Sequence, residues 1–291
     1  MLYPVIYVGT CGYAYRDWVG PFYPTRPHHM SPDEFLPYYA TKFRAVEIDT
    51  TYYHVPKWRN IHALNRRTPS DFRFSFKAPS TVTHPPEVRA RVHDDAQLLV
   101  ERLSAVRASG KLACILAQFP NSFGVSEANE DYVRRVVEAF DGIPVVVEFR
   151  RRQWQSPKTL ALLREIGAGY CNVDMPSYDT LLMPSADATS RLGYVRMHGR
   201  NAQTWWTGTN VTRYDYDYQA EDLVPWSDRV AELEAQTEET FVFFNNHARG
   251  QAARNAQLME SLLEERYGES APNIVAIPPE APAEQPSFPG F

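Results

Sequence analysis

Eight short apolar runs, each bounded by turn-forming residues, recur along the chain. They cover residues 5–10, 45–50, 72–77, 112–119, 143–150, 169–175, 192–199 and 240–246. Runs of this length, rich in branched and aromatic residues, are typical of buried strands. In several of them polar residues alternate with apolar ones, so that the strand has one polar face.

Helical patterns lie between most of these runs. Apolar residues return at steps of three, four or seven over 88–109, 126–141 and 251–267, and shorter helices fit 32–43, 57–67, 156–167 and 226–238. The helical signal between the sixth and seventh strands is weak. Eight strands that alternate with helices predict a (β/α)8 TIM barrel. The alternative, an open doubly wound sheet, seldom needs eight strands, and no G-x-G-x-x-G follows the first one.

We expect a single barrel domain over 1–270. Residues 272–291 contain six prolines and end in "PSFPGF". A segment of this composition buries too little apolar surface to fold. The sequence therefore predicts that 271–291 form an extended or disordered tail outside the barrel.

Polar residues cluster near the carboxyl ends of the predicted strands. They are Glu47, Asp49, Lys77, Gln118, Glu148, Arg150, Asp174, Arg196, His198, Asn245 and Asn246. In TIM barrels, catalytic groups sit at the carboxyl ends of several strands. The alternative for any one of these residues is a structural ion pair. For the whole set we favour a site at the barrel mouth, because buried charges are costly unless every one of them is paired.

Two loops at the same end are rich in aromatic residues, and two anion sites are predicted beside them. The loops are residues 11–29 and 200–218, and the second contains Trp205 and Trp206. Their aromatic side chains suit stacking of bases or sugars. The alternative is that they form a lid or pack in the ordinary way.

The first anion site joins Arg196, Arg200 and Asn201. The second is the run Asn245, Asn246, His247 and Arg249, which leads into a helix amino terminus, where free N–H groups favour phosphate.

Composition narrows the class of protein. The net charge of −5 argues against general coating of nucleic acid but is compatible with a local basic cleft. No apolar stretch is long enough for a membrane span, and the first residues do not resemble a signal peptide. The three cysteines lack C-x-x-C spacing, which argues against a disulfide framework and a zinc site. We expect a cytoplasmic protein that does not bind membranes.

Seven ordered motifs resemble those of domain-of-unknown-function family 72, the YecE-like proteins. They are "YVGTCGY", "VEIDTTYY", "FSFKAP", "LAQFP", "VEFR", "YVRMHGR" and "FFNNHARGQA", and the likeness covers roughly residues 5–265. The resemblance implies a TIM barrel and brings no established activity. Members of the family often have Ser where this chain has Cys11, so a thiolate nucleophile is not expected there.

The residues at the mouth favour a hydrolase or lyase that acts on a phosphate-bearing substrate, a nucleotide or nucleic acid. Glu47 or Glu148 would be the general base and His198 a general acid or base, while Lys77, Arg150 and Arg196 would hold anionic oxygens. A divalent metal could bind through Glu47, Glu148, Asp174 and His198 or His247. It is not favoured, because the mouth offers few histidines.

Three alternatives remain open. The first is a non-catalytic module that binds nucleotides or nucleic acid with the same aromatic and Arg residues. A glycosidase is less favoured, because the fourth and seventh strands end in Gln118 and Arg196 instead of carboxylates. A Schiff-base aldolase through Lys77 is the third. For Lys77 the sequence favours an ion pair with Glu47 or Glu148 instead.

Overall fold

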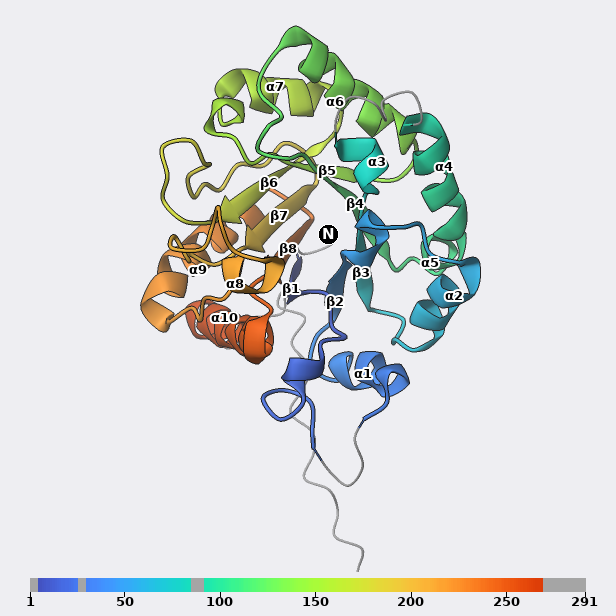
Figure 1. The fold of residues 1–291 in the computed structure, drawn as a ribbon, viewed down its shortest axis with the longest axis vertical. Coiled ribbons are helices and arrows are strands. Elements are labelled where there is room, and N and C mark those ends of the chain that lie inside the picture. Colours follow the sequence, from blue (N-terminus) through green and yellow to red (C-terminus); the bar gives the residue numbers. More distant parts are fainter. Residues whose placement is uncertain (1–4, 26–29, 85–91, 269–291) are drawn as a thin grey trace, which may run out of the picture.

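Eight parallel strands form a closed barrel in which each strand pairs with the next in sequence and β8 returns to β1 (Figure 1). The computed structural model describes residues 5–25, 30–84 and 92–268. The strands are β1 (Val5–Cys11), β2 (Ala45–Ile48), β3 (Arg73–Lys77), β4 (Leu112–Gln118), β5 (Val145–Glu148), β6 (Gly169–Asp174), β7 (Leu192–Met197) and β8 (Glu239–Phe244). The predicted (β/α)8 barrel is confirmed.

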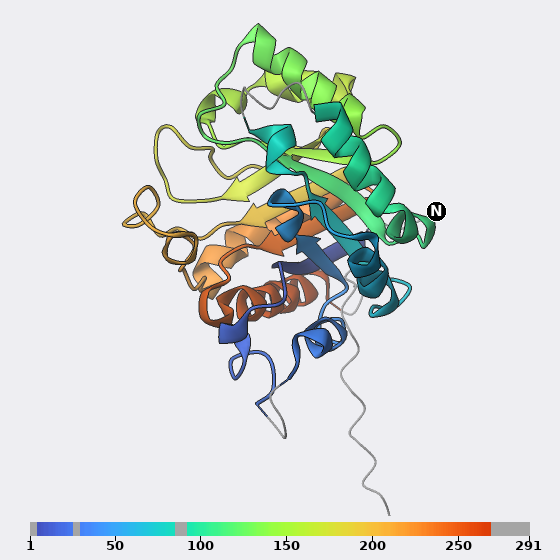
Figure 2. The same ribbon diagram turned by 45° about the vertical axis from the view of Figure 1, so that its right-hand side comes forward.

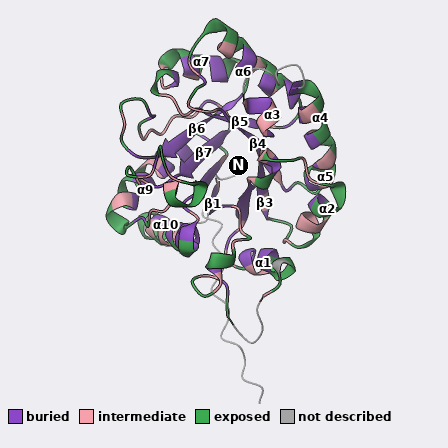
Figure 3. Cartoon of the chain, in the orientation of Figure 1, coloured by how far each residue is buried: buried purple, intermediate pink, exposed green. Residues whose placement is uncertain are grey.

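Helices cover the outside of the barrel (Figures 1 and 2). The longer ones are α1 (Pro32–Tyr39), α2 (Trp58–Arg66), α4 (Val92–Arg102), α6 (Glu127–Ala139), α7 (Pro157–Glu165), α9 (Ala220–Glu234) and α10 (Gln251–Tyr267). Short helices are α3 (Ser80–Thr83), α5 (Ser104–Ala108) and α8 (Asn210–Arg213). The longer helices turn a buried stripe toward the strands and an exposed stripe to solvent, which gives the pattern of purple and green in Figure 3.

Two helices begin where their sequence caps them. The Ser126 hydroxyl accepts a hydrogen bond from the Asn129 N–H at 3.2 Å, and the Ser156 hydroxyl accepts one from the Thr159 N–H at 3.2 Å. These bonds satisfy N–H groups that have no partner inside the helix. Helices α6 and α7 therefore start within one residue of the predicted positions.

Two helical predictions differ from the structure, and one segment with a weak signal has no helix. The predicted helix 226–238 is observed as α9, which starts at Ala220 and carries Pro225 in its second turn. Leu223 and Trp226 are buried against the barrel, so the helix extends to the amino-terminal side of Pro225. The predicted helix 88–109 is observed as α4 and α5, with a break at Leu103, and residues 88–91 lie outside the described part. Residues 175–191, where the signal is weak, contain no helix.

The remaining predictions on chain organisation concern the ends and the membrane. The predicted tail, 271–291, lies outside the described residues, so the domain boundaries stay a prediction. Within the described ranges, no helix has the length and apolar character required to span a bilayer.

Candidate functional site

Arg196 on β7 lies between two buried carboxylates inside the barrel. Its Nη2 donates to Glu47 Oε1 on β2 at 2.6 Å, and its Nη1 donates to Glu148 Oε2 on β5 at 2.6 Å. The side chains of both glutamates are 0% exposed, and that of Arg196 is 2% exposed. The other oxygen of Glu47 accepts a hydrogen bond from the Tyr194 hydroxyl at 2.8 Å. Charges this deeply buried are tolerated because they compensate one another.

Glu148 also holds a histidine and a second arginine. Its Oε1 accepts from His198 Nε2 at 3.0 Å and lies 2.5 Å from Nε of Arg150, although that N–H is not aligned for a hydrogen bond. Burial alone would raise the pKa of the Glu148 carboxyl, but Arg150 and Arg196 hold it well below its usual value. Glu148 therefore stays ionised and acts as an anchor for the cations around it.

His198 is neutral in this environment. Burial, followed by the charge of Arg150, lowers its pKa to about 3. Its Nδ1 accepts a hydrogen bond from the Asn245 amide at 3.0 Å, and its Nε2–H donates to Glu148. Both ring nitrogens are engaged, so His198 positions Glu148 and has no nitrogen free for a ligand.

A cavity of about 1170 Å³ opens above this cluster at the carboxyl end of the barrel. Its charged lining comprises Asp33, Asp49, Arg59, Arg67, Lys77, Arg150, Arg196 and Arg213, and its histidines are His54, His84 and His247. Gln118 and Asn245 also line it. A cavity of this volume holds a ligand of nucleotide size.

Three of the lining cations have no carboxylate partner. Within residues 5–25, 30–84 and 92–268, Lys77, Arg59 and Arg213 take part in no ion pair. The Nζ atom of Lys77 lies 4.4 Å from the centre of the Tyr52 ring. The favoured sequence interpretation, an ion pair of Lys77 with Glu47 or Glu148, is wrong, because Arg196 and Arg150 already occupy those carboxylates.

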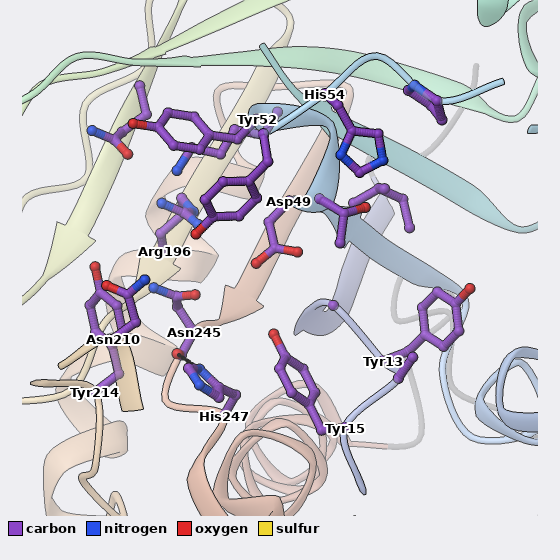
Figure 4. Close-up of a pocket in the computed structure, with 18 of the residues that line it drawn as sticks. Tyr13, Tyr15, Asp49, Tyr52, His54, Arg196, Asn210, Tyr214, Asn245 and His247 are labelled. Carbon is purple, nitrogen blue, oxygen red and sulfur yellow. Dashed lines mark hydrogen bonds between the residues drawn. The ribbon is translucent and has the colours of Figure 1, made fainter. Parts of the chain in front are cut away.

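Asp49 differs from the two glutamates beside it. It follows β2 and lines the cavity, and no hydrogen bond or ion pair joins its carboxylate to another described residue. Figure 4 shows that carboxylate pointing into the space between Tyr15 and Arg196. Burial, followed by the charge of Glu47, raises its pKa, although Lys77 and Arg196 act against the increase. A carboxyl group of this kind can carry a proton.

Tyr214 was predicted only as one of several aromatic residues of the loop 200–218 and not as a site residue of its own. It lines the cavity, and its ring centre lies 5.8 Å from that of His198 and 5.9 Å from that of Trp205. Burial would raise the pKa of its hydroxyl, but Arg150, Lys77 and Arg196 bring it below the usual value. The only sequence signal was the aromatic and Arg-rich loop 200–218, which does not tell which ring points inward.

Both aromatic loops line the cavity, as predicted for their position. Trp205 is buried, while Trp206 beside it is 48% exposed. Tyr15 from the first loop stacks on His247, with ring centres 4.7 Å apart. Residues 26–29 of the first loop lie outside the described part.

The predicted cluster of Arg196, Arg200 and Asn201 does not form. Arg200 instead binds the buried Asp174 carboxylate, with Nη2 2.7 Å from Oδ2, and also pairs with Asp222. Asp174 additionally accepts hydrogen bonds from Tyr218 and Trp226, both at 2.6 Å. Asn201 donates to backbone carbonyls of its own loop. Arg200 and Asn201 hold the loop after β7 and, like Asp174, do not line the cavity, whereas Arg196 does line it.

The second predicted anion site is also occupied by the protein itself. The Arg249 N–H donates to the Asp17 carboxylate at 2.7 Å, and its guanidinium pairs with Asp215 at 2.6 Å. Asn246 donates to Asn255 and to the backbone. Arg249, which precedes α10, is therefore already bound to two carboxylates of the protein. Neither Asn246 nor Arg249 lines the cavity.

The metal ligands considered from the sequence do not share one site, although Glu148 and His198 are in contact. Glu47 and Glu148 face Arg196, while Asp174 binds Arg200. In the described part of the chain, no three His, Cys, Asp or Glu side chains are grouped to hold a metal ion.

Comparison with known proteins places the chain in a family context. The model of the family described as "Protein of unknown function DUF72" matches residues 7–283. UPF0759 protein YunF of Bacillus subtilis (strain 168) is 31% identical over 287 residues, which cover 92% of this chain and 98% of YunF. UPF0759 protein YecE of Escherichia coli (strain K12) is 32% identical over 123 residues, which cover 42% of this chain and 40% of YecE.

Solved structures of DUF72 family proteins are similar to this chain over most of its length. A DUF72 family protein from Thermotoga maritima MSB8 matches with a TM-score of 0.82 and 36% identity, over 89% of this chain and 99% of that one.

Proposed function

Because this chain belongs to the DUF72 family, which is described by its unknown function, we propose an activity from the chemistry of the cavity. We propose a hydrolase or lyase that acts on a phosphate-bearing substrate bound at the carboxyl end of the barrel. The observation that carries the proposal is the excess of positive charge along the cavity wall that has no carboxylate partner among the described residues.

Six Lys and Arg side chains line the cavity against two Asp, in a chain whose net charge is −5. One of those aspartates, Asp33, already pairs with Arg67 at 2.8 Å. Lys77, Arg59 and Arg213 are left without a carboxylate partner among the described residues. Positive charge concentrated in a concave site attracts anions, and guanidinium groups bind phosphate oxygens through charge-assisted hydrogen bonds.

The residues divide into two roles. Arg150 and Arg213 hold anionic oxygens of the substrate, and Asp49 transfers a proton to or from the reacting group. Glu47, Glu148 and His198 support the cations from beneath. This differs from the catalytic roles inferred for them from the sequence, because none of the three lines the cavity.

Aromatic rings in the cavity would bind the part of the substrate that carries no phosphate. Tyr15, Tyr52, Trp205 and Tyr214 line the same cavity as the cations. Faces of such rings stack on bases and sugars, so a nucleotide or a sugar phosphate satisfies both parts of the wall.

A non-catalytic nucleotide- or nucleic-acid-binding module is the second candidate. The rim of the cavity favours it, because Tyr53 is 68% exposed and Trp206 is 48% exposed, and exposed rings suit stacking of successive bases. A glycosidase has less support, because it needs two carboxylates at the cavity. Among the described lining residues only Asp49 offers a carboxylate that is not already in an ion pair.

The test combines calorimetric titration with a turnover assay. We expect ADP and ribose 5-phosphate to bind more tightly than adenosine and ribose. Arg213→Gln should weaken the phosphorylated ligands about ten- to a hundredfold, because one charge-assisted hydrogen bond is lost. This substitution leaves no carboxylate behind, since Arg213 pairs with none in the described chain. Arg134→Gln, on the exposed face of α6, is the matched control and should bind like the parent.

Turnover separates the two candidates. Phosphorus magnetic resonance on a panel of nucleotides and sugar phosphates should show product from the parent and none from Asp49→Asn, which should still bind. Equal binding of phosphorylated and phosphate-free ligands would refute the proposal. Binding without any product across the panel would support the non-catalytic module instead.

A further inference from the structure

We propose that Lys77 forms a covalent imine with the carbonyl carbon of a phosphorylated aldehyde or ketone bound in the cavity. This inference rests on the proposed function for the phosphate group and adds the reacting group of the substrate. The aldolase alternative was disfavoured from the sequence because Lys77 was expected to form an ion pair, and that pair is absent from the described structure.

The five lysines of the chain have different surroundings. Lys111 donates to backbone oxygens of Asn65 and Thr68 at 2.7 and 2.8 Å, and Lys158 pairs with Glu130 at 2.7 Å. Lys77 ends β3, and among the five only Lys77 lines the cavity. Its amine therefore faces the space where a substrate would lie.

The neighbours of Lys77 favour the neutral amine. Burial, followed by the charge of Arg196, lowers its pKa. The nearby carboxylates that would stabilise the ammonium form, Glu47 and Glu148, are bound to Arg196. Only a neutral amine has the lone pair that attacks a carbonyl group, so this arrangement prepares the nucleophile.

Tyr52 and His84 hold the amine from one side. The Tyr52 ring lies beneath Nζ of Lys77, and its hydroxyl lies 3.1 Å from Nε2 of His84. Burial, followed by the charge of Lys77, lowers the pKa of His84 to about 4, so the imidazole is neutral and adds no further cation. Tyr52 thus restricts the amine to the cavity side of its ring.

Asp49 supplies the proton transfers. It lines the same cavity, and its charge and that of Lys77 influence each other. The amine nitrogen attacks the carbonyl carbon, and one N–H proton passes through Asp49 to the oxygen, which gives a carbinolamine. The second N–H proton follows by the same route, the C–O bond breaks, and water leaves as the C=N bond forms. Both hydrogens of the water therefore come from the amine.

Reductive trapping tests the proposal. The full chain is incubated at pH 7 with glycolaldehyde phosphate and sodium cyanoborohydride, which reduces the imine to a stable secondary amine. Intact mass and peptide mapping then locate the adduct. We expect one adduct on the peptide that contains Lys77, formed at least about tenfold faster than with glycolaldehyde, since the phosphate adds a charge-assisted contact.

Three variants make the result specific. Lys77→Met should lose this adduct, and Lys77→Arg should lose it as well while keeping the positive charge. Lys158→Met, remote from the cavity on α7, should be labelled like the parent. Circular dichroism confirms that each variant is folded.

The outcomes separate this inference from the proposed function. Labelling spread over the lysines and unchanged in Lys77→Arg would overturn the imine. If calorimetry still showed binding of phosphorylated ligands, the proposed function would stand without it. Selective labelling of Lys77 at equal rates by both probes would overturn the phosphorylated substrate class, here and in the proposed function.

Discussion

Arg196→Met tests the buried charge cluster beneath the cavity. The substitution removes two hydrogen bonds of 2.6 Å to carboxylates that are fully buried. Glu148 keeps Arg150 and His198 as neighbours, but within the described chain the Glu47 carboxylate keeps only the neutral Tyr194 hydroxyl as a hydrogen-bond partner. The variant therefore contains a carboxylate without a compensating cation.

The expected cost follows from that imbalance. Removing one partner of a buried ion pair destabilises a protein by about 3–5 kcal/mol. With a urea dependence of about 3 kcal/mol per M, the midpoint of unfolding should fall by about 1–2 M. The double variant Glu47→Gln with Arg196→Met removes the stranded charge as well. It should recover at least about 2 kcal/mol, because a neutral pair in a buried site avoids the cost of desolvating a charge.

Urea unfolding followed by tryptophan fluorescence measures these differences. Arg134→Met is the matched control, because Arg134 binds Glu165 with two hydrogen bonds of 2.8 and 2.9 Å on the exposed surface. Water and salt screen that pair, so its loss should move the midpoint far less than loss of Arg196.

The pH dependence supplies a second check on the same cluster. The pKa of Glu148 is well below its usual value because Arg150 and Arg196 outweigh the effect of burial. A carboxyl group whose pKa is lower in the folded than in the unfolded protein stabilises the fold at any pH above its unfolded-state pKa, which is about 4.3 for Glu. This stabilisation is lost as the pH falls toward the folded-state pKa. The gap between parent and Arg196→Met should therefore be widest near neutral pH and narrow below about pH 4. A cost under about 1 kcal/mol, or no recovery in the double variant, would refute the reasoning.

Three further predictions concern single residues. Asp49→Asn should raise the urea midpoint at pH 7, because the raised pKa of Asp49 means that its ionisation disfavours the folded state; the gain should disappear as the pH falls through about 4. Asp174→Asn should lower the free energy of unfolding by about 3 kcal/mol in the same assay yet leave ADP affinity unchanged, because Asp174 binds Arg200 outside the cavity lining. Gly9→Ala should lower the free energy of unfolding by at least about 2 kcal/mol, because the added Cβ would lie 2.2 Å from the Ala45 carbonyl oxygen. A urea midpoint like that of the parent would contradict the close contact between β1 and β2.

The sequence by itself determined the architecture. Strand and helix periods are local properties, so all eight strands could be located to within two residues at either end. The same alternation put Glu47, Glu148 and Arg196 on the inward face of their strands, where the structure has them. The start of α9 was missed, because the turn before Pro225 is held by burial of Leu223 against the barrel and not by a local sequence pattern.

Which charges pair was decided only by the tertiary structure. Arg196 is 149 residues from Glu47 along the chain, and the distance between their side chains depends on barrel closure across strands β2 and β7. Two cations near the barrel mouth differ in their partners. Arg200 forms an ion pair with Asp174, whereas Lys77 forms no ion pair within the described chain. Residue type and position along a strand give the face of a side chain but not its partner. The partner depends on distances of a few ångströms between strands that meet only in the closed barrel, and those distances decide whether a buried charge anchors the fold or is left for a ligand.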